Sequence, residues 1–245
     1  MSYDLIYTNG DSFVAGTGLV QHKYIEDKLY TLDEWKSNYK KIFDKTTIKK
    51  IHDLYSSEYL PKNEKENAWP NTLEKITNIK TINDAYHSQS ASTIAIKSIE
   101  SLKKLKKDHK KILALIGTTT TGRLWFPNSG TNSILLNAHS EGRLTKLEAD
   151  IAEYYLRNSK PEELKNHYDV VFLGLIKFAE KNEIDLYFIN HYYSENTDVT
   201  KEFLIDEIGA EANPKLPVFT ACGHYPKKYH DNLAYRLKNY FKELQ

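Results

Sequence analysis

Short apolar runs alternate along this chain with segments of helical periodicity, and this alternation limits the fold more than any other feature. The runs have the length of strands and lie at residues 5–7, 79–83, 112–117, 184–190 and, more weakly, 216–219. Between them, apolar side chains recur every three or four residues, as at Ile96, Ile99, Leu102 and Leu105, at Val171, Leu175 and Phe178, and at Leu233, Leu237, Tyr240, Phe241 and Leu244. Such stripes are typical of helices with one buried face. Strands separated by helices predict an α/β fold, with a parallel sheet of roughly five strands and helices on both faces.

Length and composition fit one folded domain spanning residues 1–245. The chain has 245 residues, 40% of them hydrophobic, and α/β folds of about 250 residues routinely form one domain. A formal net charge of +1 gives no general attraction to nucleic acid. The single Cys222 excludes an intramolecular disulfide and a cysteine-based zinc cluster.

No targeting or membrane segment is evident in the sequence. The first expected strand follows the initial residues directly, and no apolar run approaches the roughly 18 residues of a membrane-spanning helix. We therefore expect a soluble cytoplasmic protein that binds neither nucleic acid nor membranes; if a phage encodes it, the location would be the host cytoplasm or the virion. The sequence gives no indication of the oligomeric state.

Two segments exceed the strand–helix repeat and are predicted to be insertions, at about residues 21–67 and 125–165. The first is polar and helix-prone. The second holds a Pro-Asn-Ser-Gly turn and a predicted helix around residues 147–156. Either insertion would form a cap that shapes a substrate pocket, or helical decoration on the flank of the sheet, and the sequence leaves both possibilities open.

Polar loops follow four of the expected strands. They comprise residues 10–12, 83–88, 117–123 and 190–191. The carboxyl ends of parallel strands meet at one edge of the sheet, where such folds bind their ligands. We therefore expect the functional site at this edge.

The first of these loops contains Gly10-Asp11-Ser12. Gly10 allows a tight turn with close backbone approach, and the Ser12 amide lies where a helix begins and can donate to a developing oxyanion. Ser12 is therefore a candidate nucleophile. The alternative is an ordinary helix cap, because Asp-Ser after a strand also serves that purpose.

His224 lies shortly before the last predicted helix. A neutral imidazole, whose pKa is ordinarily about 6.5, suits removal of a serine proton at neutral pH. A surface histidine in a turn rich in tyrosine and lysine is the alternative. If both assignments hold, Ser12 and His224 form a nucleophile and its base.

The motifs and their order resemble the SGNH/GDSL family of serine hydrolases, in a divergent subgroup of phage and bacterial proteins. Gly10-Asp11-Ser12 is similar to the family's first block, and Gly223-His224-Tyr225-Pro226, followed by His230, is similar to its last. The segments 68–70 and 82–90 resemble the subgroup's middle blocks, Trp-Pro and a strand ending in Asn. The resemblance implies a three-layer, flavodoxin-like fold and a serine esterase that needs no cofactor.

The resemblance also implies an oxyanion hole made by the amides of Ser12 and Ser88 and the hydroxyl of Thr119. The family normally has Gly at the position of Ser88 and Asn at that of Thr119, and Ala221 replaces the Asp that orients the histidine. Three alternatives remain for His224: a Ser-His dyad with a main-chain carbonyl on Nδ1, another carboxylate in that role, or degraded activity.

The expected reaction is hydrolysis of a small ester, for example an acetylated carbohydrate or a short acyl ester. The rival is a catalytically decayed binding module or virion component that keeps the fold. A nucleotide-binding flavodoxin-like protein is a third reading, which would leave His224 without a role.

Arg123 and Asp11 are further candidates, for substrate binding. An arginine can clamp an acidic group, and an ion pair at the surface is the alternative for Arg123. The nine histidines show no His-x-x-x-His or comparable ligand spacing on one expected helix, so no metal site is predicted.

Overall fold

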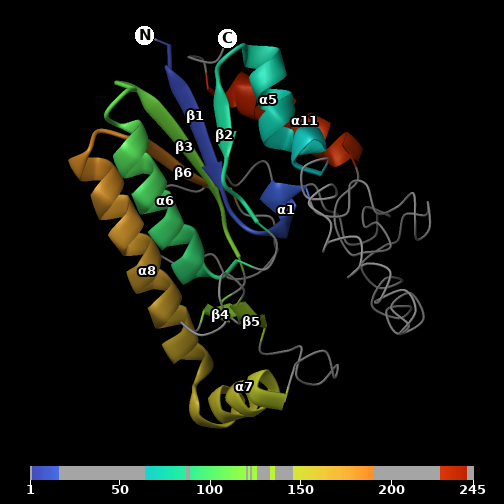
Figure 1. Ribbon diagram of the computed structural model, residues 1–245, viewed down its shortest axis with the longest axis vertical. Helices are drawn as coiled ribbons and strands as arrows, with labels where there is room; N and C mark the ends of the chain where they lie inside the picture. Colours follow the sequence, from blue (N-terminus) through green and yellow to red (C-terminus); the bar gives the residue numbers. More distant parts are fainter. Residues whose placement is uncertain are drawn as a thin grey trace.

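The computed structural model describes most of the predicted strand and helix segments; the described residues are 2–16, 64–86, 89–119, 121, 123–125, 133–135, 146–189 and 227–241. Four parallel strands form the main sheet: β1 (Leu5–Asn9), β2 (Thr81–Asn83), β3 (Ile112–Gly117) and β6 (Asp185–Ile189). Their order is β2-β1-β3-β6 (Figure 1). In chain order this is 2-1-3-4, the beginning of the flavodoxin-like arrangement.

The two central strands are buried along their whole length. Every residue of β1 and β3 is buried, which explains why their sequences are nearly continuous apolar runs rather than alternating ones. The bounds of β3 match the prediction. β2 begins at Thr81, two residues later than predicted, because Asn78 ends the preceding helix in the left-handed conformation and residues 79–80 form the connection. The expected fifth strand, 216–219, lies outside the described residues.

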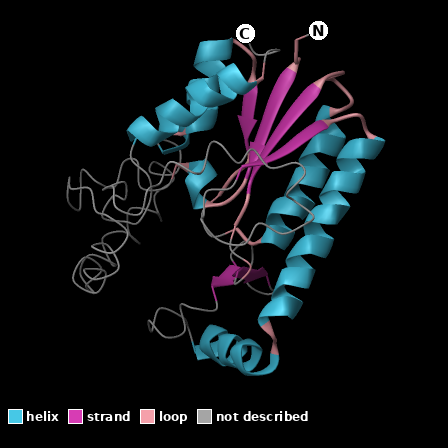
Figure 2. Ribbon diagram, turned by 180° about the vertical axis from the view of Figure 1, so that it is seen from behind, coloured by secondary structure: helices cyan, strands magenta, loops and turns pink. Residues whose placement is uncertain are grey.

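Helices cover both faces of the sheet and give the predicted three layers (Figure 2). α6 (Ala91–Leu105) and α8 (Pro161–Lys181) lie on one face, and α5 (Trp69–Thr77) and α11 (Lys227–Tyr240) lie on the other. The short α1 (Ser12–Ala15) follows β1 directly and packs with the second pair. The α/β fold class is therefore as the sequence predicted, with four strands in the described part of the sheet.

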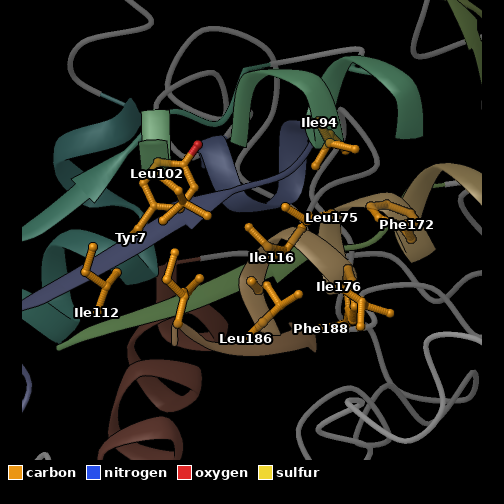
Figure 3. Packing of buried hydrophobic residues seen from close by; sticks show 14 of the residues in the cluster. Tyr7, Ile94, Leu102, Ile112, Ile116, Phe172, Leu175, Ile176, Leu186 and Phe188 are labelled. Atoms are coloured by element: carbon orange, nitrogen blue, oxygen red, sulfur yellow. The ribbon is translucent and has the colours of Figure 1, made fainter. Parts of the chain in front are cut away.

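The apolar stripes of α6 and α8 form the core between these helices and the sheet (Figure 3), except at Ile96, which is 47% exposed because it lies on the outer face of α6. Phe172 of α8 is fully buried and makes edge-on contacts with Tyr168 and with Phe188 of β6, at 4.7 and 5.0 Å between ring centroids. Side chains from α6, Ile94 and Leu102, complete the layer. Local signals set the ends of the helices: the Ser90 hydroxyl caps α6 by accepting a hydrogen bond from the Thr93 amide at 3.2 Å.

The second predicted insertion contains β5 (Ser133–Leu135), α7 (Lys146–Asn158) and the first turn of α8. β5 pairs in an antiparallel ribbon with β4 (Arg123–Trp125), which ends where the insertion begins. Figure 1 shows the ribbon beyond the carboxyl end of β3. The predicted helix around 147–156 is thus confirmed. Residues 21–63 of the first insertion lie outside the described residues, so whether the insertions form a cap stays open.

None of the helices in the described residues combines the length and the apolar character that crossing a membrane requires.

Candidate active site

The site is built around two glycines, at the carboxyl ends of β1 and β3, that lie in contact. A Cβ placed on Gly10 would come within 3.1 Å of the Cα and carbonyl oxygen of Gly117, and within 2.5 Å of Val14 Cγ2. Gly10 also has φ of +154°, a conformation that other residues rarely adopt. The two loops that follow these strands therefore run side by side. In this strand order, the carboxyl ends of β1 and β3 form the switch point where such folds bind ligands.

Ser12 lies two residues after Gly10, as the first residue of α1. The residue is buried, with 4% of its surface exposed, and the Asp11 carbonyl accepts a hydrogen bond from the Ala15 amide at 3.0 Å, closing the turn. The sequence placed Ser12 directly after the first strand, and this location is confirmed.

Two buried amide side chains fix the backbone of the Ser12 turn. Asn9 donates through Nδ2 to the Ile94 carbonyl at 3.1 Å and to Ser98 Oγ at 3.0 Å, and its Oδ1 accepts from the Gly10 amide at 2.8 Å. Gln89 Nε2 donates to the Gly10 carbonyl at 2.9 Å and to Asn9 Oδ1 at 3.2 Å. Neither residue was predicted from the sequence as part of the site. In the sequence, Asn9 is a polar residue at the end of a buried strand. Gln89 immediately precedes Ser90, the residue that caps α6.

A buried ion pair connects the Ser12 turn to the loop after β3. Arg123 Nη1 lies 2.9 Å from Asp11 Oδ2, and the Asp11 side chain is completely buried while that of Arg123 is 13% exposed. The same nitrogen donates to Thr119 Oγ1 at 3.3 Å. The sequence analysis considered a surface ion pair for Arg123; the pair is instead internal. Contact of Arg123 or Asp11 with a substrate stays a prediction.

The loop after β3 is also held from β6. The amide and hydroxyl of Thr118 donate to the Ile189 carbonyl, at 2.9 and 3.3 Å. Tyr168 of α8 is buried near Thr118 and Thr119. Burial raises the pKa of Tyr168, and the negative charge of Asp11 raises it further. The sequence analysis missed Tyr168, although it precedes the apolar stripe of α8 by three residues.

The loop after β2 contributes a third set of contacts. Asn83 Nδ2 donates to the Val14 carbonyl of α1 at 3.3 Å, and Lys65 Nζ donates to the Asn83 carbonyl at 3.2 Å. Burial lowers the pKa of Lys65, partly offset by the charge of Asp84. Asp84 Oδ2 accepts from Ser101 Oγ at 2.5 Å. Three loops from three neighbouring strands thus converge around α1.

The remaining predicted site residues, Ser88 and His224, lie outside the described residues, as does Ala221, so the distance between Ser12 and His224 stays a prediction. His230 is described. It is almost fully buried, and its Nδ1 accepts a hydrogen bond from the Trp69 amide at 3.1 Å. This histidine therefore joins α11 to the start of α5.

No group of three or more His, Cys, Asp and Glu side chains that could hold a metal ion occurs among the described residues.

Of the comparisons with known proteins, the one with solved structures returns matches. No protein-family model and no curated protein matches the chain. Among solved structures, a protein assigned to the G-D-S-L lipolytic family from Desulfitobacterium hafniense DCB-2 is 12% identical, with 97% of this chain and 99% of that chain covered and a TM-score of 0.47. The esterase EstA from a Pseudoalteromonas species is 11% identical, with 98% and 97% covered and a TM-score of 0.43. A carbohydrate esterase is 14% identical, with 99% and 69% covered and a TM-score of 0.47.

Proposed function

We propose that this protein is a serine esterase that hydrolyses a small ester, with Ser12 as the nucleophile and His224 as the base. The observation that carries the proposal is the position of Ser12. It follows a glycine turn at the switch point between β1 and β3, and polar side chains of Asn9, Gln89 and Arg123 contact that turn or the adjacent Asp11. An acetylated carbohydrate or a short acyl ester is the proposed substrate class.

In the proposed reaction, Ser12 Oγ attacks the ester carbonyl carbon while its proton passes to Nε2 of His224. The amides of Ser12 and Ser88 and the Thr119 hydroxyl stabilise the negative charge on the carbonyl oxygen. The tetrahedral intermediate then breaks its bond to the alcohol, which leaves with the proton from His224. A water molecule, deprotonated by His224, attacks the acyl-enzyme, and the acid is released as Ser12 regains its proton.

Ala221 makes a Ser-His dyad the simplest form of this mechanism. A base needs its second ring nitrogen held so that Nε2 faces the nucleophile as an acceptor. A main-chain carbonyl can hold Nδ1–H, but it brings no full charge to stabilise the imidazolium. Turnover should therefore be slower than in a triad with an orienting carboxylate, whose loss lowers the rate by about four orders of magnitude in serine proteases.

A fluorophosphonate probe tests the proposal directly. It should label the wild-type protein at Ser12, whereas Ser12→Ala should not be labelled, and hydrolysis of a short-chain aryl ester should fall in both Ser12→Ala and His224→Ala. The double variant should lose little more than either single variant, because the two groups act as a unit.

The chain offers a matched control in a Ser–His pair away from this turn. Ser92 Oγ and His167 Nε2, on α6 and α8, lie 3.0 Å apart near the surface. Ser92→Ala and His167→Ala should leave labelling and hydrolysis unchanged. Loss of labelling in Ser92→Ala would assign the nucleophile to Ser92 instead, and absence of labelling in a folded wild-type protein would favour the binding module.

A further inference from the structure

The mechanism above uses Thr119 but gives no role to the ion pair beside it. One nitrogen of Arg123 bonds both Asp11, the neighbour of the proposed nucleophile, and Thr119, the proposed oxyanion donor. Burying an ion pair costs desolvation free energy that its mutual attraction often only offsets. The Asp11 carboxylate is completely buried and the Arg123 side chain nearly so, so this pair adds little to stability relative to an apolar pair of the same size.

Hydrogen-bond chemistry fixes the direction of the contact between Arg123 and Thr119. A guanidinium can only donate, whereas a hydroxyl has one proton and two acceptor sites. In the contact at 3.3 Å the Thr119 oxygen must therefore accept from Arg123 Nη1. This leaves the single Thr119 proton to be donated to another acceptor.

We propose that Asp11, Arg123 and Thr119 form a relay that makes the Thr119 hydroxyl an oxyanion donor. Asp11 holds the guanidinium, and Arg123, a positioning residue, fixes Thr119 Oγ1 as an acceptor so that its proton is available to the ester carbonyl oxygen. A hydroxyl that accepts from a cation becomes a stronger donor, because hydrogen bonds in series polarise one another. The cationic charge also favours the negative charge that develops on the substrate oxygen. This inference rests on the proposed function.

The residue before Thr119 supports the geometry of the relay. The Thr118 amide and hydroxyl donate to the Ile189 carbonyl, at 2.9 and 3.3 Å, while Arg123 contacts the Thr119 side chain. Thr119 is therefore held through the backbone of its neighbour and at its own hydroxyl. It is 5% exposed, which limits competition from water for its proton.

Steady-state kinetics with an aryl ester test the relay. Thr119→Val, which removes the hydroxyl at similar volume, should lower kcat about 10²–10³-fold, as the loss of one oxyanion donor does, with KM within about threefold. Thr119→Ser, which keeps a hydroxyl, should recover most of kcat. A role in folding alone would not separate kcat from KM in this way.

A double-mutant cycle then tests the link to the ion pair. The neutral pair Asp11→Asn/Arg123→Gln removes both charges together, so that no buried charge is left alone. It should lower kcat about tenfold or more in the wild-type background, within the range of coupling between contacting groups, and by less than about twofold in the Thr119→Val background.

If circular dichroism shows that the variant with the neutral pair does not fold, Arg123→Lys takes its place in the cycle. Arg157→Gln, which removes an exposed arginine paired with Glu153 on α7, is the matched control and should change nothing.

The outcomes separate this inference from the proposed function. An active wild-type protein with additive effects of the neutral pair and Thr119→Val would overturn the relay and leave the esterase intact. A wild-type protein that neither reacts with the probe nor hydrolyses esters would overturn both.

Discussion

Gly10 shows at the scale of one residue how the site depends on its backbone. Its φ of +154° and the contact with Gly117 leave no room for a side chain. The turn brings Asp11 to Arg123 and Ser12 to the start of α1, so the glycine positions both residues although it has no chemistry of its own.

We predict that Gly10→Ala lowers the free energy of unfolding by about 1–3 kcal/mol, the cost of a residue held in a sparsely populated conformation. The nearest atom to the added methyl group belongs to Val14 of α1, so labelling of Ser12 should fall as well. Gly174 is the matched control. It lies within α8 with nothing within 4 Å of its Cβ position, and Gly174→Ala should raise the free energy of unfolding by about 0.5–1 kcal/mol. Urea titrations of the two variants measure the difference, and equal effects would contradict this account.

At the scale of elements, the regular parts of the fold followed from local patterns. β3 has the predicted bounds because a strand buried on both faces is an unbroken apolar run, which the sequence shows directly. The stripes of α6, α8 and α11 were predicted at most positions, but Ile96 and Tyr240 are exposed. The start of β2 was not, because it depends on the left-handed residue Asn78 that ends α5.

The contents of the site were predictable only in part. Ser12 and Thr119 were placed at one edge because each follows a recognisable strand. The Asp11–Arg123 pair joins residues 112 positions apart in sequence, and its burial depends on how two loops cross. No local pattern specifies such a contact. Tyr168 was missed for a related reason: a tyrosine next to a helix stripe is ordinary core, and only the packing of α8 on β6 shows where its hydroxyl points.

His230 connects two elements, α5 and α11, through one hydrogen bond to the Trp69 amide. We predict that His230→Leu lowers the free energy of unfolding by about 1–3 kcal/mol, because the buried amide at the start of α5 loses its acceptor. His230→Asn places an oxygen near the position of Nδ1 and should recover part of the loss. His167→Ala, at an exposed histidine of α8, should stay within about 0.5 kcal/mol of wild type. Thermal or urea unfolding provides the measurement, and a neutral effect of His230→Leu would show that another acceptor serves Trp69.

At the scale of the whole molecule, one face of the sheet buries two tyrosine hydroxyls. Tyr7 lies on β1 beneath α6, and Tyr168 lies on α8 at the carboxyl edge. Burial is the main cause that raises the pKa of both phenols, and the carboxylates Asp84 and Asp11 raise the pKa of Tyr7 and Tyr168, respectively. The folded state therefore keeps protons on these groups at alkaline pH values where the unfolded chain releases them.

This difference in tyrosine pKa between the folded and unfolded states predicts that the protein becomes less stable at alkaline pH. A tyrosine in the unfolded chain has a pKa of about 10, so both contributions are fully present below that pH and are lost as the pH rises toward the folded values. The free energy of unfolding should fall above about pH 10, by up to about 1.4 kcal/mol per pH unit for each tyrosine. Lys65, whose pKa is lowered in the folded state, acts in the opposite direction below about pH 10.4, and the two tyrosines outweigh it at higher pH.

Urea titrations between pH 8 and 11.5 measure the free energy of unfolding at each pH. Its decrease with pH should become about half as steep in Tyr7→Phe and also in Tyr168→Phe. Tyr235→Phe, on the exposed side of α11, should leave the slope unchanged. If both core substitutions leave the pH dependence of the free energy of unfolding as it is in the wild-type protein, the titrating groups lie elsewhere in the molecule.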